Sequence, residues 1–365
     1  MKLRLRPAEG SLEHIKHRYG ANQPVSGSRG RIYGTGLFIR LMAEPIGCKT
    51  KAPEERRSHQ IVQISPHAIQ YRPANMFGKY ATLTDPIHNN TYAAISPLRP
   101  ELSQAGKTIL ISGGNTGIGY GIARGFVKAS AAKVIITGRR AEVVSQAARD
   151  LQRQGDKTEI IGIPCDVSNE ASVEALWDKL KSEGTVVDVL ALNAVGFPPK
   201  KPLRDIGTHG IWKLFDVNVR AQLQMSERFL RQDGIGETKT KAISVHDFNV
   251  GSEYPGYALT KHSVQLALQL IAQDSSPEEV QIISYHPGAI FTENARDKGW
   301  TEDAIPWDHV DLPGHFAVWA ASPEAKFLHG RFAWASWDVG KLQSGDIRKR
   351  IDQDPAYLKI GINGL

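Results

Sequence analysis

Short apolar runs alternate with amphipathic stretches along the chain from residue 106 onward. The runs 107–112, 133–137, 159–164, 186–192, 241–245 and 280–286 (KTILIS, KVIIT, EIIGIP, VVDVLAL, KAISV and VQIISYH) have the length and composition of buried strands. Helical patterns lie between them, over roughly 117–130, 141–154, 170–182 and 206–230, and from residue 257. Buried strands that alternate with amphipathic helices predict an α/β fold, in which a parallel sheet is covered by helices on both faces.

Residues 1–100 lack this alternation and are rich in Gly, Pro, Ser and Arg. We expect a loosely structured basic extension over 1–100 and a folded domain over 101–365. The net charge of +7 comes from this extension, because residues 1–60 hold twelve Lys/Arg against five Asp/Glu and the remainder holds 33 of each. The basic balance therefore does not indicate a nucleic-acid partner.

The rest of the composition indicates a soluble protein in a reducing compartment. No apolar run approaches the roughly eighteen residues that a membrane span needs, so no membrane partner is expected. The two cysteines, Cys48 and Cys165, lie far apart, which argues against a disulfide scaffold. We expect a cytoplasmic protein; a mitochondrial transit peptide is the alternative, which Glu9 and Glu13 disfavour.

A glycine-rich turn, SGGNTGIG (112–119), follows the first predicted strand and opens the first helix. Gly113 suits a tight turn, Gly117 lets the backbone approach a pyrophosphate, and Gly119 allows close helix–strand packing. The helix N-terminus then offers unpaired N–H groups to phosphates. A structural loop can use the same residues, but a position between strand and helix favours a dinucleotide site.

The residues that follow the second strand distinguish the two nicotinamide cofactors. An NAD site places a carboxylate there, to accept from the ribose 2′-hydroxyl. This chain instead has Arg139 and Arg140 in the run ITGRR. Guanidinium groups suit a 2′-phosphate, so NADP is the cofactor that we predict. The alternative is a solvated pair at a helix start.

Tyr257 and Lys261 are four residues apart, on one side of a predicted helix. Tyrosine has a pKa near 10, so it transfers protons poorly at neutral pH unless its anion is stabilised. An ammonium about 4 Å away supplies roughly 4 kcal/mol at an effective dielectric constant near 20. Tyr254 precedes Pro255-Gly256 and is expected in the loop. Alone, such a pair is more typical of a helix surface.

Further motifs give the pair a context. They are CDV (165–167), LNAVG (192–196), DVNV (216–219), Ser244 at the end of the fifth predicted strand (241–245), YALTK (257–261) and HPGAIFT (286–292). In this order, and with the glycine turn, they resemble the short-chain dehydrogenase/reductase family. The stretch 311–340 (DLPGHFAVWAASPEAKFLHGRFAWASWDVG) resembles fungal members of this family, which are often encoded beside secondary-metabolite pathways. The resemblance implies a Rossmann-like doubly wound domain. The chain departs from the family where Asn-Asn-Ala-Gly is replaced by Leu192-Asn193-Ala194-Val195.

The resemblance also implies roles for individual residues. Tyr257 would exchange the proton, Lys261 would lower its pKa, Ser244 would donate to the substrate oxygen and Asn218 would hold a water of the proton relay. Cofactor contacts would come from Gly113, Asn115, Gly117, Ile118, Gly119, Arg139, Arg140, Asp166, Val167, Asn193, Ala194, Tyr257, Lys261, Ile290 and Thr292.

The function expected is an NADP-dependent carbonyl reductase or alcohol dehydrogenase, of the EC 1.1.1 type, that acts on a small-molecule carbonyl or alcohol. The alternatives are a regulator that senses NADP(H) without turnover and, within the enzyme class, an epimerase or dehydratase on the same scaffold. The aromatic and histidine side chains that follow strand ends either line a substrate pocket or pack ordinary loops; they are His246, Phe248, Tyr254, Phe197 and Trp300. No metal site is expected, since His14 and His17 have no carboxylate partners. A homo-oligomer is left open, and the substrate identity is not specified.

Overall fold

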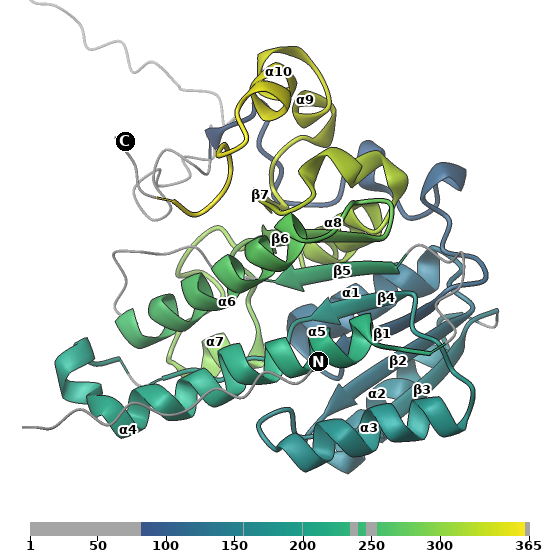
Figure 1. Cartoon of the computed structure of the whole chain (residues 1–365), viewed down its shortest axis with the longest axis vertical. Coiled ribbons are helices and arrows are strands. Elements are labelled where there is room, and N and C mark those ends of the chain that lie inside the picture. The colour runs from purple at the N-terminus through teal and green to yellow at the C-terminus, as the bar shows by residue number, and fades with distance from the viewer. Residues whose placement is uncertain (1–81, 156, 199, 234–239, 246–253, 362–365) are drawn as a thin grey trace, which may run out of the picture. The chain divides into compact units, whose positions relative to one another are not determined.

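The computed structural model describes residues 82–155, 157–198, 200–233 and 254–361, and the backbone of residues 240–245 (Figure 1). All of them lie in one compact unit, Ala68–Leu365. Within these residues, no helix combines the length and the apolar character needed to cross a bilayer.

Seven parallel strands form a single sheet, with the order β3-β2-β1-β4-β5-β6-β7. Their bounds are β1 Thr108–Ser112, β2 Lys133–Gly138, β3 Glu159–Pro164, β4 Val189–Leu192, β5 Thr240–Val245, β6 Val280–His286 and β7 Arg331–Trp334. The chain runs outward from β1 to β3 and then returns to place β4 on the other side of β1. This reversal is the doubly wound topology, so the predicted Rossmann-like fold class is confirmed.

Helices cover both faces of the sheet (Figure 1). One face carries α1 Gly117–Lys128, α2 Ala141–Gln152 and α8 Asp311–Ala320, and the other carries α3 Glu170–Ser182, α5 Ala221–Leu230 and α6 Pro255–Gln273. The remaining described helices are α4 Leu203–Phe215, α7 Glu293–Asp297, α9 Val339–Leu342 and α10 Gly345–Gln353.

Successive strand residues supply the two cores. Ile109 and Ile111 pack under α1 and α8, whereas Leu110 packs under α3 and α5, because side chains alternate across a strand. All three are fully buried, which explains why the strands are continuous apolar runs.

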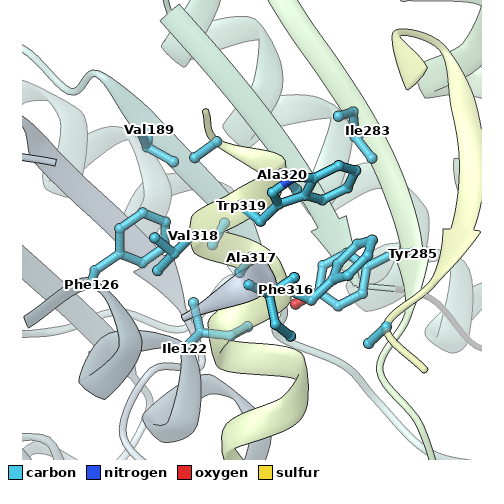
Figure 2. Packing of buried hydrophobic residues seen from close by; sticks show 14 of the residues in the cluster. Ile122, Phe126, Val189, Ile283, Tyr285, Phe316, Ala317, Val318, Trp319 and Ala320 are labelled. Carbon is cyan, nitrogen blue, oxygen red and sulfur yellow. The ribbon is translucent and has the colours of Figure 1, made fainter. Parts of the chain in front are cut away.

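Glycines allow α1 and α8 to approach each other closely. A Cβ on Gly121 would lie 2.6 Å from the carbonyl oxygen of Val310, and one on Gly314 would lie 2.3 Å from the carbonyl oxygen of Gly121. Real side chains do not tolerate such distances, so the helix pair depends on these small residues. Figure 2 shows the result, with Phe126 of α1 near α8 and Trp319 of α8 packed beside β6.

The packed domain begins before residue 101, which corrects the boundary drawn from the sequence. Ile95 and Leu102 are fully buried in the core that contains α8. The hydroxyl of Tyr92 donates to the carbonyl of Trp337 over 2.8 Å, and Arg99 forms a 2.7 Å ion pair with Glu324. The sequence does not reveal residues 82–100 as part of the domain, because they form only turns and short 3-10 helices and their packing is against residues far along the chain. Residues 1–81 lie outside the described part of the chain.

His315 of α8 anchors this early segment. Its side chain is hydrogen-bonded through Nδ1 to Thr91, and only 5% of its surface is exposed. Burial lowers the pKa of His315 to about 4, because the charged imidazolium would lose its hydration. The unfolded chain therefore takes up a proton, near pH 6.5, that the folded protein does not bind.

We expect acid to destabilise the fold through this residue. Between pH 7 and pH 5, the wild type should lose about 2 kcal/mol more unfolding free energy than His315→Gln, which cannot be protonated. Urea denaturation at the two pH values measures the difference, with Thr91→Val as a control that keeps the histidine. Equal losses in the wild type and His315→Gln would contradict the assignment.

Candidate active site

The predicted site residues gather at the carboxyl edge of the sheet, where the strand order reverses. Ser112 pairs with Leu192, Leu192 pairs with Ser244, and Ser244 pairs with Ser284, so β1, β4, β5 and β6 end side by side. A crevice outside such strand ends is where doubly wound sheets bind their ligands. The loops after these strands carry most of the residues selected from the sequence.

The glycine turn is held in a conformation that larger residues would disrupt. Gly113 and Gly117 have φ values of +66° and +53°, in the left-handed region. A Cβ on Gly119 would lie 2.1 Å from the carbonyl oxygen of Gly113, so the helix can begin directly against the turn only with glycine there. Ile118 is half-buried in the first turn of α1. The first N–H groups of α1 remain at the edge of the sheet for a ligand.

Asn193 ties this turn to the loop after β4. Its Nδ2 donates to the carbonyls of Ser112, at 3.1 Å, and Gly113, at 3.0 Å. The hydroxyl of Ser112 accepts from the backbone N–H groups of Asn193 and Ala194, at 3.0 and 3.1 Å. The side chain of Asn193 therefore braces the turn, and Ser112 is a positioning residue that the sequence reasoning did not select.

The segment after β6 also meets the turn. The methyl group of Thr292 lies 3.2 Å from the place where a Cβ on Gly117 would be. The hydroxyl of Thr292 caps α7 by accepting from the N–H of Ala295 at 3.3 Å. Ile290, two residues earlier, is buried and bridges to Asp308. Thr292 and Gly117, far apart in sequence, thus share one side of the candidate pyrophosphate site.

The two arginines after β2 have different surroundings. Arg139 is exposed, and Arg140 precedes α2 with one guanidinium nitrogen 3.7 Å from a carboxylate oxygen of Glu293 in α7. Asn115 reaches the end of β2, since its Oδ1 lies 2.2 Å from where a Cβ on Gly138 would be. A cavity of about 390 Å³ opens beside it, between α1 and α2, lined by Asn115, Tyr120, Glu142, Val143, Gln146, Ala147 and Asp150.

Asp166 and Val167 follow β3, further along the same edge. The carboxylate of Asp166 accepts from the N–H of Ser168 at 3.0 Å and from its hydroxyl at 2.7 Å, which fixes the turn. Val167 is buried, with 8% of its surface exposed. Both residues thus lie after the strand that pairs with β2.

The pair that prompted the catalytic hypothesis lies at the start of α6. The helix begins at Pro255, so Tyr254 stands just outside it, as predicted, and Tyr257 lies in its first turn. Tyr257 is 9% exposed and Lys261 only 3% exposed, and the Lys261 ammonium is 5.7 Å from the centroid of the Tyr257 ring. A helix-surface pair would be solvated; this pair is buried.

Asn218 is fully buried in a π-helical segment, Asp216–Arg220, between α4 and α5. Its Oδ1 accepts from the N–H of Gly196 at 2.7 Å. Its Nδ2 donates to the carbonyl of Gly196 at 2.9 Å and to the hydroxyl of Thr260 at 3.0 Å. Thr260, which sequence reasoning missed, donates in turn to the carbonyl of Tyr257 at 2.8 Å. Asn218 therefore joins the loop after β4 to the helix of Tyr257.

Ser244 is described only through its backbone, at the end of β5 beside Leu192. Its side chain, and the loop that leads to Tyr254, lie outside the described residues. The sheet edge nevertheless holds Ser244 at the strand end next to the loop that bears Asn193.

Aromatic rings surround Tyr257. The Phe197 ring stacks on it with centroids 4.3 Å apart, and it meets Tyr254 edge-on at 5.3 Å. Phe197 and Tyr254 thus lie beside Tyr257, whereas His246 and Phe248, the other loop residues of the pocket hypothesis, lie outside the described residues. Trp300 packs instead against Trp307, with centroids 6.0 Å apart.

Comparison with known proteins identifies the family of this chain. Residues 107–303 match the family model of short chain dehydrogenases. The chain is 31% identical over 289 residues to the short chain dehydrogenase/reductase AacuD of Aspergillus aculeatus, covering 78% of this chain and 98% of that protein. A short chain dehydrogenase/reductase of Claviceps purpurea is 29% identical over 290 residues, covering 79% and 97%.

Two further proteins extend the comparison. An NADP-dependent (R)-specific alcohol dehydrogenase of Lentilactobacillus kefiri is 30% identical over 244 residues, covering 62% of this chain and 93% of its own. The solved Pseudomonas aeruginosa RhlG/NADP active-site complex superposes with a TM-score of 0.58 at 23% identity, covering 65% of this chain and 97% of that one. It shows the same fold.

The chain belongs to the short-chain dehydrogenase/reductase family and resembles its fungal members. It is an oxidoreductase of the α/β, Rossmann-like class.

The glycine turn gives a direct test of the candidate nucleotide site. Gly119→Ala should abolish measurable dinucleotide binding, because the added methyl group would collide with the Gly113 carbonyl and the Asn193 amide. Isothermal titration with NADPH measures binding, and circular dichroism checks that the protein is folded. Gly361→Ala is the control, since a Cβ there meets nothing within 4 Å. Unchanged affinity in a folded Gly119→Ala protein would exclude this turn as the site.

Proposed function

We propose that the protein is an NADP(H)-dependent oxidoreductase that transfers a hydride between the nicotinamide and the carbonyl or alcohol carbon of a small molecule. The observation that carries this proposal is the continuity between the glycine turn and the tyrosine. Asn193 holds the turn, and Phe197, four residues later in the same loop, stacks on Tyr257. Cofactor cradle and proton donor therefore flank one loop.

The residues present fit a dinucleotide. The positive φ angles of Gly113 and Gly117 leave the turn without side chains, and α1 begins at Gly117 with its N–H groups at the sheet edge. Asp166 and Val167 would border the adenine, while Ala194, Ile290 and Thr292 would lie along the nicotinamide half. When bound, the nicotinamide supplies or accepts the hydride.

Tyr257 is the proposed general acid for carbonyl reduction, and the base for alcohol oxidation. The buried ammonium of Lys261 favours the phenolate that Tyr257 becomes when it gives up its proton, because burial weakens the screening between them. Ser244 is proposed to donate a hydrogen bond to the substrate oxygen as negative charge develops on it.

The hydrogen bonds of Asn218 favour a different role from the water-binding one that the family resemblance implies. Both N–H groups of its amide already donate, to Gly196 and Thr260, so the amide has no donor left for a relay water. We assign Asn218 to positioning: it holds Thr260, whose hydroxyl donates to the Tyr257 carbonyl and fixes the first turn of α6. A relay water near Lys261 would have to donate to an acceptor on this segment.

The preference for NADP rests on Arg139 and Arg140, which lie after β2 where a carboxylate would serve NAD. The NADP-dependent relative from Lentilactobacillus kefiri supports it. Four further expectations stay predictions: a role in secondary metabolism, a cytoplasmic or mitochondrial location, self-association, and the absence of a nucleic-acid partner.

Tyr257→Phe should reduce kcat for ketone reduction by about a hundredfold to ten-thousandfold, the usual contribution of a positioned proton donor, and leave NADPH affinity nearly unchanged. NADPH oxidation at 340 nm against a panel of ketones and aldehydes measures kcat. Tyr357→Phe, near the carboxyl end of the chain, is the control. Full activity of Tyr257→Phe would refute the mechanism, and NADPH binding without turnover by the wild type would favour the regulator.

Replacing both Arg139 and Arg140 with Ala should weaken NADPH binding about tenfold to a hundredfold and change NADH binding little, because only the 2′-phosphate loses charge-assisted hydrogen bonds. Glu293→Gln should tighten NADPH binding, since its carboxylate competes for Arg140. Titration of the wild type and of these variants with NADPH and with NADH measures the affinities. Equal losses for NADPH and NADH would contradict the phosphate assignment.

A further inference from the structure

Lys298 lies at the carboxyl end of α7, next to the aromatic rings at Tyr257. Its ammonium is 2.7 Å from the centroid of the Phe197 ring and 5.2 Å from that of Tyr254. The side chain is half-buried. A lysine in this position is unusual, because its hydrated charge normally extends into solvent.

Phe197 separates this charge from the reactive tyrosine. Tyr257 stacks on the ring at 4.3 Å, and an ammonium 2.7 Å from the same centroid cannot share that face. Lys298 therefore lies over the opposite face. The order Tyr257, Phe197, Lys298 defines a short line from the proton donor to a fixed cation, along an aromatic surface.

No protein carboxylate neutralises this cation among the residues that the structure describes. Glu293 at the start of α7 faces Arg140, and Arg296 lies 5.0 Å from the ring of Phe291. Asp297, the acid next to Lys298 in the chain, is exposed. Burial lowers the pKa of Lys298 to about 8, and no attraction to an acid opposes the shift. The amine is still mostly protonated at neutral pH, with its hydration only partly replaced by the rings.

We propose that Lys298 binds a carboxylate of the substrate, and that the substrate is an aromatic ketone or alcohol whose ring packs against Tyr254 and the edge of Phe197, since Tyr257 and Lys298 cover the two faces of Phe197. This inference rests on the oxidoreductase function proposed above and specifies its substrate class. An ammonium binds a carboxylate through charge-assisted hydrogen bonds, which are stronger than its attraction to a ring. A carboxylate at Lys298 places the body of the molecule along the rings toward Tyr257.

The cofactor is a poorer partner for this lysine than the substrate. The residue of this segment that touches the glycine turn is Thr292, at the other end of α7, which lies against Gly117. Lys298 comes six residues later and contacts the rings around Tyr257. The two ends of α7 thus face different halves of the candidate site.

A matched pair of ketones tests the proposal: 4-acetylbenzoate, which carries a carboxylate, and its methyl ester, which does not. The wild type should have the higher kcat/KM for the acid. Lys298→Met should lower kcat/KM for the acid about tenfold or more and leave that for the ester within about threefold. Lys298→Arg should retain the preference. Arg296→Met, which removes a cation two residues away on the same helix, should not change the ratio.

Binding provides a second readout that does not depend on turnover. Quenching of tryptophan fluorescence by 4-acetylbenzoate, with NADP⁺ present, should saturate in the wild type and weaken about tenfold in Lys298→Met. Two results would overturn the inference without contradicting the proposed oxidoreductase function. One is turnover by the wild type with no preference for the acid, and the other is an equal loss of kcat/KM for acid and ester in Lys298→Met. Lys298-dependent binding without turnover of either ketone would support the inference and refute the proposed reaction. If the wild type neither turns over nor binds 4-acetylbenzoate, the inference is overturned.

Discussion

The contact between the glycine turn and the loop after β4 is the constraint on which the rest of the site depends. Asn193 donates two hydrogen bonds from one amide to consecutive carbonyls, those of Ser112 and Gly113. These carbonyls belong to the end of β1, where the strand hydrogen bonds stop and a side chain must satisfy the backbone. Asn193 thereby joins the turn after β1 to the loop after β4, the two strands between which the strand order reverses.

That contact extends to the proposed proton donor through a series of short links. The loop held by Asn193 continues to Gly196, which exchanges two hydrogen bonds with Asn218. Asn218 then holds Thr260, and Thr260 holds the first turn of α6. Every one of these groups is at least partly buried, so an unmade bond would leave a desolvated polar atom. The position of Tyr257 relative to the turn follows from this chain of bonds.

Much of the fold was predictable because its signals are local. The strands 159–164 and 280–286 and the helix 170–182 have the bounds expected from their apolar pattern. The helix α6 begins at Pro255, two residues before the start expected from the sequence. Residues 82–100 were not recognised, because their burial comes from contacts with α8 and with residues near Trp337. The expected helix 206–230 is divided by the π-helical segment, which widens the turn at Asn218 and carries no sequence signature.

The candidate site divides in the same way. Backbone-driven features, such as Gly113, Gly119 and the Tyr257–Lys261 spacing, could be predicted because the geometry demands those residue types. Ser112, Thr260 and Lys298 are ordinary residues that gain a role only from neighbours far along the chain. Their roles required the three-dimensional arrangement.

The short helix α7 joins the two halves of the proposed site. Thr292, its cap, lies against the glycine turn, Glu293 faces Arg140, and Lys298 ends the helix at Phe197. A five-residue helix is marginal by itself, so its position depends on these end contacts. A phosphate that took Arg140 from Glu293 would release one end, and a carboxylate on Lys298 would fix the other. Cofactor and substrate binding are therefore expected to be coupled through α7.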